Sequence, residues 1–239
     1  MRILRDGVRS FYYRNWVLPR ISRTYKHLTT AEVFRRIYVR RAWGADEQGP
    51  FNSGSGSRGF IAEEYCAWVG NFIRQQGFRT VADLGCGDFY VGSRIVQDTG
   101  VNYIGVDIVP ELIEHHRATF ARTGVAFECS DITRDRLPAA DLCLIRQVFQ
   151  HLSNAQILAA LDNIKHYSCA LISEHVLRKP RSFNIDKAHG PHIRTSYGSG
   201  VYLDYPPFCC PITKEWEIPV DNESVIRTVL IQNQSAVRS

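Results

Sequence analysis

The chain has 239 residues, of which 44% are hydrophobic and 22% charged, and its formal net charge is +5. This composition is typical of an ordinary soluble globular protein. No apolar run approaches the length of a membrane span, and the first residues lack the features of a signal peptide, so we expect a cytoplasmic location. The seven cysteines are an odd number without framework spacing, which argues against a disulfide scaffold, and the absence of a C-x-x-C pair argues against a zinc motif.

Positive charge is concentrated in residues 1–42, which hold eleven Lys and Arg against two acidic residues, so the remaining chain is net acidic. Aromatic residues are interleaved with these charges. The pattern favours contact with an anionic membrane surface or a nucleic acid, or else a helical face that packs on the rest of the chain or on a second copy. We therefore divide the chain into a basic helical N-terminal arm with a Gly/Ser loop, residues 1–57, and a main domain, residues 58–239.

The predicted elements begin with two helices, over residues 31–43 and 59–75, where apolar side chains recur at helical spacing. Short apolar strands then alternate with helices. Strands are predicted at 80–84, 103–107, 125–129, 141–145, 170–173 and 225–232, and helices at 91–99, 111–122 and 154–167, the last with Ser153 as its N-cap. This alternation predicts an α/β, Rossmann-like doubly wound, mostly parallel sheet.

Residues 178–215 interrupt the alternation and are rich in Pro, Gly, His and Tyr. Long irregular segments in compact domains are usually lids or binding loops. We therefore predict a ligand-binding insert before the last strands of the sheet.

A glycine loop follows the first predicted strand. Gly85 and Gly87 allow the backbone to approach a ligand closely, and Asp83 inside the strand can face a cationic amino group. The third glycine of the dinucleotide motif G-x-G-x-x-G would fall at Tyr90, so the spacing does not fit that motif.

The next two strand ends also carry carboxylates. Asp107 ends the second strand, where a carboxylate can accept both hydroxyls of a ribose. Asp131 follows the third strand and can accept an adenine amino group, while the backbone amide of Ile132 can meet a ring nitrogen. Three successive strand ends thus offer contacts for an amino acid, a ribose and an adenine.

Together, Asp83-Leu-Gly-Cys-Gly-Asp88, Gly105-Val-Asp107 and Ser130-Asp-Ile132 resemble the signature of class I S-adenosylmethionine-dependent methyltransferases, over roughly residues 78–177. The resemblance implies a seven-stranded sheet, S-adenosylmethionine as cofactor and S-adenosylhomocysteine as its product. The cofactor-binding residues that it implies in these segments are Asp83, Gly85, Cys86, Gly87, Asp107, Ile108, Ser130, Asp131 and Ile132.

The chain is also similar to a group of bacterial methyltransferases found among glycan-modifying genes. The shared segments are Ser-Gly-x-Gly-Ser at 53–57, Gly105 to Glu111, Arg146 to Ser153, and Pro206 to Phe208. This similarity points to a saccharide as the methyl acceptor.

Methyl transfer to a hydroxyl needs a base that removes its proton. His151 follows the fourth strand, where this fold places its acceptor-side loop, so we predict it as the general base; a histidine that only forms hydrogen bonds is the alternative. Arg146 at the strand end and Arg58 in the Gly/Ser loop are candidates to bind the carboxylate of the cofactor.

The insert and its neighbours supply polar groups suited to a sugar-like acceptor. The predicted acceptor-binding residues are Gln147, Glu174, His175, His189, Arg194, Tyr202 and Asp204. The spacing of the acidic and histidine residues matches no defined metal motif, so no metal site is predicted. Asp204 to Phe208 superficially matches the box of nucleic-acid amino-methyltransferases, but that box belongs directly after the fourth strand, so nucleic acid is not the expected partner.

The leading hypothesis is an S-adenosylmethionine-dependent O-methyltransferase that acts on a hydroxyl of a saccharide, such as a lipid-linked or surface glycan, or of a similar small polar acceptor. One alternative is an RNA methyltransferase that uses the basic arm. The other is a non-catalytic cofactor-binding partner subunit. A peripheral membrane contact through the basic arm and a homodimer are further possibilities.

Overall fold

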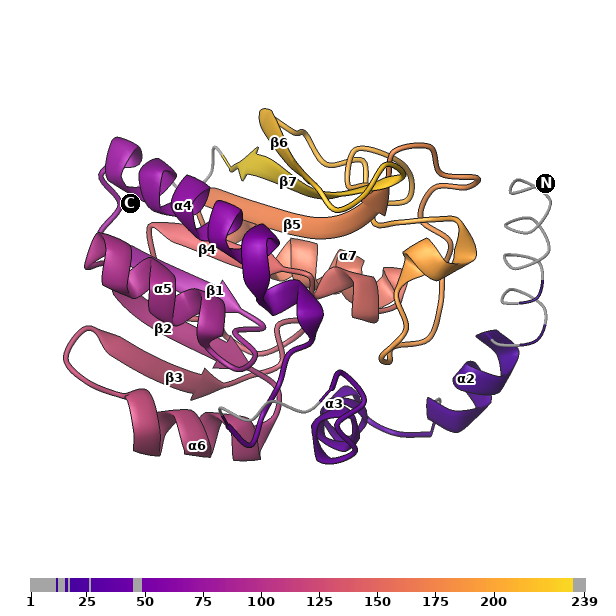
Figure 1. The fold of residues 1–239 in the computed structure, drawn as a ribbon, viewed down its shortest axis with the longest axis horizontal. Helices are drawn as coiled ribbons and strands as arrows, with labels where there is room; N and C mark the ends of the chain where they lie inside the picture. Colours follow the sequence, from indigo (N-terminus) through magenta and orange to yellow (C-terminus); the bar gives the residue numbers. More distant parts are fainter. Residues whose placement is uncertain (1–11, 13–15, 17, 26, 45–48, 234–239) are drawn as a thin grey trace.

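A computed structural model describes residues 12, 16, 18–25, 27–44 and 49–233. The predicted basic arm comprises residues 1–57, and most of its residues before residue 18 lie outside the described residues. The described part is built around one seven-stranded sheet with the order β3-β2-β1-β4-β5-β7-β6 (Figure 1). The strands are β1 (Thr80–Leu84), β2 (Asn102–Asp107), β3 (Val125–Cys129), β4 (Leu142–Arg146), β5 (Cys169–Leu177), β6 (Lys214–Pro219) and β7 (Ser224–Gln232).

Strands β1 to β5 are parallel, whereas β7 runs antiparallel to β5 and β6 antiparallel to β7. Crossover helices join β1 to β2, β2 to β3 and β4 to β5, as the alternation predicted, whereas a loop joins β3 to β4. The reversal in strand order falls between β1 and β4, and ligands bind in the crevice at the carboxyl ends of strands at such a point. The prediction missed β6, an edge strand whose Lys214, Glu215 and Glu217 are exposed.

Helices cover both faces of the sheet. They are α4 (Gly59–Gln76), α5 (Tyr90–Thr99), α6 (Pro110–Phe120) and α7 (Asn154–Asn163). Alternate residues of β1 point to opposite faces: Val81 packs in one core with α4 and α5, and Ala82 packs in another with α7. Ser153 caps α7 through a capping box with Gln156, which confirms the predicted start of this helix.

Two helices precede the sheet, α2 (Leu18–Tyr25) and α3 (Thr30–Val39). A capping box between Thr29 and Glu32 starts α3. The Gln156 amide of α7 donates to the Thr30 hydroxyl at 2.8 Å, which ties α3 to the main domain. In Figure 1, α3 lies at the carboxyl ends of the parallel strands. The predicted helix 31–43 is longer than α3, which ends before Arg41 takes a positive φ of 51°.

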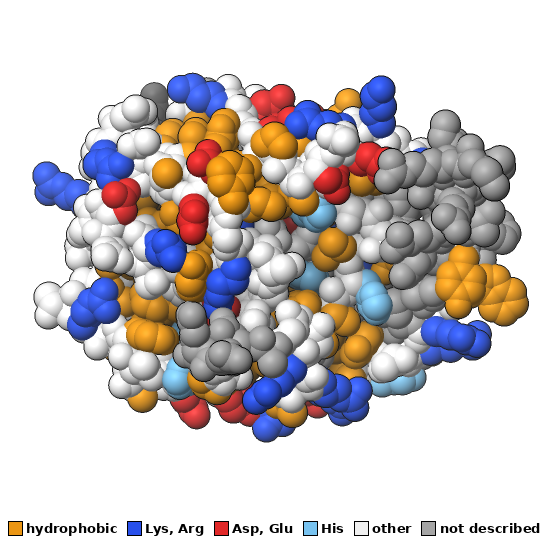
Figure 2. Space-filling view, viewed as in Figure 1, with side chains coloured by type: hydrophobic (Ala, Val, Ile, Leu, Met, Phe, Trp, Pro, Cys, Tyr) orange, Lys and Arg blue, Asp and Glu red, His pale blue; other side chains and the backbone are white. Residues whose placement is uncertain are grey.

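Exposed arginines gather on the outer side of α3 and just after it: Arg35, Arg36, Arg40 and Arg41. Figure 2 shows basic side chains along this lower edge of the molecule. The predicted contact with an anionic surface stays a prediction. None of the described helices is both long and apolar enough to cross a membrane.

The insert between β5 and β6 is irregular apart from one short 3₁₀ helix, η5 (Arg194–Tyr197). It is internally ordered, because the buried amide of Asn184 donates to the carbonyl oxygens of Tyr202, Tyr205 and Pro206 at 2.9–3.2 Å. All seven cysteines lie in the described part of the chain, and all are free.

Candidate functional site

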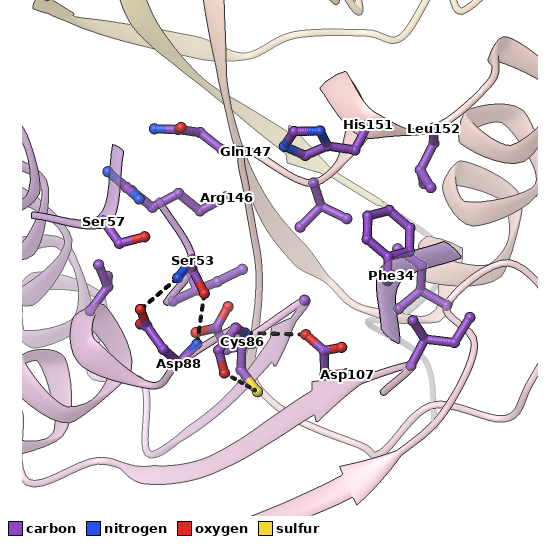
Figure 3. Close-up of a pocket in the computed structure, with 18 of the residues that line it drawn as sticks. Phe34, Ser53, Ser57, Cys86, Asp88, Asp107, Arg146, Gln147, His151 and Leu152 are labelled. Carbon is purple, nitrogen blue, oxygen red and sulfur yellow. Dashed lines mark hydrogen bonds between the residues drawn. The ribbon is translucent and has the colours of Figure 1, made fainter. Parts of the chain in front are cut away.

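A pocket opens at the carboxyl ends of β1, β2 and β4, where the sheet reverses its strand order (Figure 3). Twelve predicted site residues line it: Asp83, Gly85, Cys86, Gly87, Asp107, Ile108, Ser130, Asp131, Ile132, Arg146, Gln147 and His151. Figure 2 shows histidine and hydrophobic side chains together in a hollow near the middle of the viewed face. The strand ends that the sequence singled out therefore converge on one cavity.

The glycine loop forms the floor of this pocket. Gly85 and Gly87 have φ angles of 85° and 55°, which favour glycine. A Cβ atom at Gly85 would lie 2.3 Å from Cγ2 of Val148, so only glycine lets these two segments approach so closely. The Gly87 amide donates to the Asp107 carboxylate at 3.2 Å, which fixes the loop against the end of β2.

Two buried carboxylates face the pocket. Asp83 accepts a hydrogen bond from the Tyr103 hydroxyl at 2.6 Å, and Asp107 accepts the backbone amide of Val109 at 3.1 Å. Burial raises the pKa of each carboxyl to about 6, although these hydrogen bonds oppose the shift. Both carboxyl groups are therefore ionised above that pH. As carboxylates they can pair with a cationic group of a ligand or accept hydrogen bonds from its hydroxyls.

The loop after β3 closes one end of the pocket. Asp131 accepts the backbone amide and the hydroxyl of Thr133 at 3.0 and 2.6 Å, which holds the loop as a turn. The side-chain amide of Asn163 donates to the Ile132 carbonyl at 3.0 Å and anchors the turn from behind. This leaves Ser130, Asp131 and Ile132 on the pocket lining.

The Gly/Ser loop forms one wall of the pocket through Ser53 and Ser57. The Ser53 amide donates to the Asp88 carboxylate, and the Asp88 amide donates to the Ser53 hydroxyl, both at 2.8 Å (Figure 3). Arg146 donates to the Gly56 carbonyl at 2.6 Å, while its Nε–H is buried without a partner among the described residues. The structure does not bring Arg58 to the pocket lining, because its guanidinium pairs with Asp88 at 3.0 Å.

The turn after β4 presents Gln147 and His151, and two buried charged residues hold its backbone. Glu174 accepts the amides of Phe149 and Gln150 at 2.8 and 3.0 Å. Burial raises the pKa of the Glu174 carboxyl to about 8. Gln147 itself has a positive φ of 56°, a conformation that costs about 1–3 kcal/mol and persists where its surroundings enforce it.

Arg194 holds the same turn from the insert. It is 1% exposed and donates to the carbonyl oxygens of Phe149, Leu152 and Ile185 and to the side chain of Asn154, at 2.8–3.0 Å. Its guanidinium is therefore fully engaged with the protein. Glu174 and Arg194, predicted as acceptor-binding residues, instead position the turn that carries His151.

His151 lies on this turn, buried between the pocket and the insert. Its Nδ1 lies 3.1 Å from the Gly190 carbonyl oxygen, which can only accept a hydrogen bond, so Nδ1 carries the proton. Burial, together with the nearby charge of Lys187, lowers the pKa of His151 to about 3. The imidazole is therefore neutral at physiological pH, with an unprotonated Nε2.

Aromatic residues of the N-terminal segment complete the pocket around His151. Trp43 lies 5.0 Å from the His151 ring and Phe34 lies 6.4 Å from it, measured between ring centroids. Both line the pocket, as does Tyr38, whose hydroxyl lies 3.2 Å from that of Ser53. The sequence showed these residues only as the apolar stripe of a helix, and nothing in that stripe indicated a site.

Four other predicted acceptor-binding residues lie outside the pocket lining. His175 faces a separate cavity and bonds to Ser224 at 3.0 Å. The Tyr202 hydroxyl donates to the Leu177 carbonyl at 2.6 Å, and Asp204 pairs with Arg227 at 2.8 Å. His189 lies in the insert and is half-buried.

Within the described ranges, no three His, Cys, Asp or Glu side chains form a group that could hold a metal ion.

Residues 81–167 match a family model described as a methyltransferase domain. A comparison with curated protein sequences gave no match. The matched residues contain β1 to β4 and the loops after them, and therefore most of the pocket lining.

Solved structures share the fold. The N-methyltransferase NodS from Bradyrhizobium japonicum WM9, in complex with S-adenosyl-L-homocysteine, is 11% identical with a TM-score of 0.58, covering 86% of this chain and 98% of that one. Human N-acetylserotonin methyltransferase, in complex with S-adenosylmethionine, is 15% identical with a TM-score of 0.52, covering 93% and 68%. Magnesium protoporphyrin IX methyltransferase from Synechocystis PCC 6803, with bound S-adenosylhomocysteine, is 13% identical with a TM-score of 0.51, covering 83% and 97%.

The pocket fits the cofactor that these findings indicate. Its glycine floor leaves no room for side chains, and two carboxylates, Asp83 and Asp107, line it. With the domain match, this makes the chain an S-adenosylmethionine-dependent methyltransferase.

Proposed function

We propose that this methyltransferase transfers a methyl group to a hydroxyl of a saccharide or similar small polar acceptor, and that His151 accepts the hydroxyl proton. The observation that carries the proposal is the state of the His151 imidazole. Its proton is held on Nδ1 by the Gly190 carbonyl, so a neutral ring with an unprotonated Nε2 lines the cofactor pocket. An amine acceptor that is already unprotonated would need no such base.

In this proposal the strand ends hold S-adenosylmethionine, which supplies an electrophilic methyl group on a sulfonium. Asp107 would accept the ribose hydroxyls, and the loop at Gly85 to Gly87 would lie against the cofactor. Asp131 and Ile132 would contact the adenine. The Nε–H of Arg146, which has no partner among the described residues, suits a carboxylate, and Asp83 suits the amino group.

The acceptor hydroxyl donates a hydrogen bond to Nε2 of His151 before transfer. With S-adenosylmethionine bound, its methyl–sulfur bond would break as the oxygen–methyl bond forms, and the hydroxyl proton would pass to Nε2 of His151 while Nδ1–H stays bonded to the Gly190 carbonyl. The positive charge thus moves from sulfur to the imidazole. Phe34 and Trp43 exclude water from this side of the pocket, which strengthens the electrostatic interactions within it.

The test is methyl transfer from carbon-13-labelled S-adenosylmethionine to a panel of methyl glycosides, with NMR detection of the methyl ether. The wild type should label at least one sugar. His151→Ala should lower turnover by about 10²- to 10⁴-fold, while affinity for S-adenosylhomocysteine changes little. His166→Ala removes an exposed histidine whose contacts among the described residues are a hydrogen bond to the Asn163 carbonyl and a ring contact with Tyr167. It is the matched control and should retain full turnover.

Unchanged turnover in His151→Ala would remove His151 as the base. Labelling of amines but of no hydroxyl would refute O-methylation.

A further inference from the structure

Among the pocket-lining polar atoms that are buried without a hydrogen-bond partner in the described part of the chain, three belong to residues around His151. They are the side-chain oxygen Oε1 of Gln150, the amide nitrogen Nε2 of Gln147 and the indole nitrogen Nε1 of Trp43. All three residues line the pocket, and Gln150 is only 4% exposed. Buried polar groups in folded proteins almost always have partners, so this group indicates a ligand that supplies them.

The orientation of the Gln150 amide follows from the tautomer of His151. Because Nδ1 of His151 donates to Gly190, its Nε2 is a bare acceptor. Nε2 of Gln150 lies 3.4 Å from that nitrogen and 3.3 Å from the Gln147 carbonyl oxygen, so it is the NH₂ group that faces both. The carbonyl oxygen of Gln150 is therefore left as a second acceptor next to Nε2 of His151.

The contact from the Gln150 NH₂ group to Nε2 of His151 is long, at 3.4 Å, so a ligand hydroxyl can replace it. A ligand that engages both acceptors then needs two adjacent donors. One hydroxyl cannot satisfy both, since it carries a single proton. Neighbouring hydroxyls on a ring can donate one to each. The N–H groups of Trp43 and Gln147 can donate in return to the oxygen lone pairs, and the Trp43 ring offers an apolar wall for the C–H face of the ring.

We propose that the acceptor carries a vicinal diol, with the hydroxyl to be methylated on His151 and its neighbour held by the side-chain oxygen of Gln150. This inference rests on the proposed function and adds a specificity-determining residue to it. On this inference, an acceptor with two neighbouring hydroxyls is a better substrate than an alcohol of the same size with one hydroxyl. The diol hydroxyl on Gln150 is not methylated and serves to orient the reacting one.

The test uses the methyl glycoside that the enzyme methylates best and its two monodeoxy analogues, each lacking one hydroxyl beside the methylated position. One analogue should lose on the order of 100-fold in kcat/KM, because Gln150 is left with a buried unpaired oxygen. Gln150→Leu should lower kcat/KM for the parent sugar to a similar extent and abolish the difference between parent and analogue. Gln150→Glu keeps an acceptor oxygen and should preserve that difference.

Thermal melting and S-adenosylhomocysteine affinity of both variants check that the fold and cofactor site are intact. Equal kcat/KM for the parent and both analogues in the wild type would overturn the diol inference and leave the proposed function standing. The diol inference would also be overturned if Gln150→Leu still had a lower kcat/KM for one analogue than for the parent sugar. If the panel contained no methylated sugar, the proposed function would fail, and the diol inference with it.

Discussion

Nδ1 of His151 and the carbonyl oxygen of Gly190 lie 3.1 Å apart, and the Gly190 amide donates back to the His151 carbonyl at 2.9 Å. This two-way contact joins the turn after β4 to the insert between β5 and β6. The insert therefore fixes the tautomer of His151, the proposed base. A substitution in the insert is expected to alter turnover even where the substituted residue does not contact the acceptor.

Lys187 should set the pH dependence of turnover. Its amine is buried without a hydrogen-bond partner among the residues that the structure describes, and its charge acts on His151 and His192. Burial, with the adjacent Arg194 guanidinium, lowers the pKa of Lys187 to about 7, although Asp186 opposes the shift. Below that pH the ammonium disfavours the imidazolium that transfer creates.

Turnover of the wild type should therefore rise as pH passes through about 7 and Lys187 becomes neutral. Lys187→Met should flatten this part of the kcat profile, while Lys179→Met, at an exposed position of the insert, should leave it in place. Identical profiles of kcat against pH for Lys187→Met and the wild type would show that the charge of Lys187 does not affect His151.

Arg194→Met should destabilise the fold, because it removes the Arg194 donors from the carbonyl oxygens of Leu152 and Ile185, and leaves the Phe149 carbonyl with the Leu152 amide alone. We expect the free energy of unfolding to fall by about 3 kcal/mol or more, as measured by urea denaturation. Arg178→Met removes an exposed ion pair with Glu217 and should cost less than about 1 kcal/mol. Similar losses in the two variants would contradict the role of Arg194 as a buried clamp.

Gly56→Ala should impair acceptor use selectively. A Cβ atom there would lie 2.4 Å from Oε1 of Gln147, so the Gln147 side chain must move. We expect kcat/KM for the acceptor to fall by roughly tenfold with little change in S-adenosylhomocysteine affinity. Gly49→Ala is the control, since no atom of the described residues lies within 4 Å of its new Cβ. Wild-type kinetics in Gly56→Ala would argue that Gln147 does not contact the acceptor.

Asp107→Asn should weaken cofactor binding. An ionised carboxylate accepts ribose hydroxyls more strongly than an amide, so affinity for S-adenosylhomocysteine should fall by about tenfold or more at pH 8. Because the pKa of Asp107 is raised to about 6, wild-type affinity should also decline as pH drops through that value. In Asp107→Asn this decline in affinity should be weaker, as measured by calorimetry across pH. The same decline in both proteins would show that Asp107 is not involved.

The central strands were predictable because each is a short apolar run next to a glycine or a carboxylate. The carboxyl ends of parallel strands lie at one edge of a sheet, so the positions of Asp83, Asp107 and Asp131 in the chain were enough to assign them to one site. Strand β6 was not predictable from such runs, since its Lys-Glu-Trp-Glu-Ile-Pro sequence is mostly exposed at the sheet edge.

The remaining walls of the site depend on tertiary packing. The stripe that contains Phe34 and Tyr38 predicts a buried helix face, but not which surface that face covers. Glu174 and Arg194 belong to residue types that suit a sugar site equally well. Only their hydrogen bonds to the turn backbone distinguish a positioning role from acceptor binding.

Titration calorimetry with S-adenosylhomocysteine, and with NAD as the control ligand, tests the assignment of the pocket most directly. We expect one S-adenosylhomocysteine to bind per chain with a dissociation constant in the micromolar range, and NAD not to bind, because Tyr90 stands where a dinucleotide site needs its third glycine. Failure of S-adenosylhomocysteine to bind, or equal binding of NAD, would contradict the account.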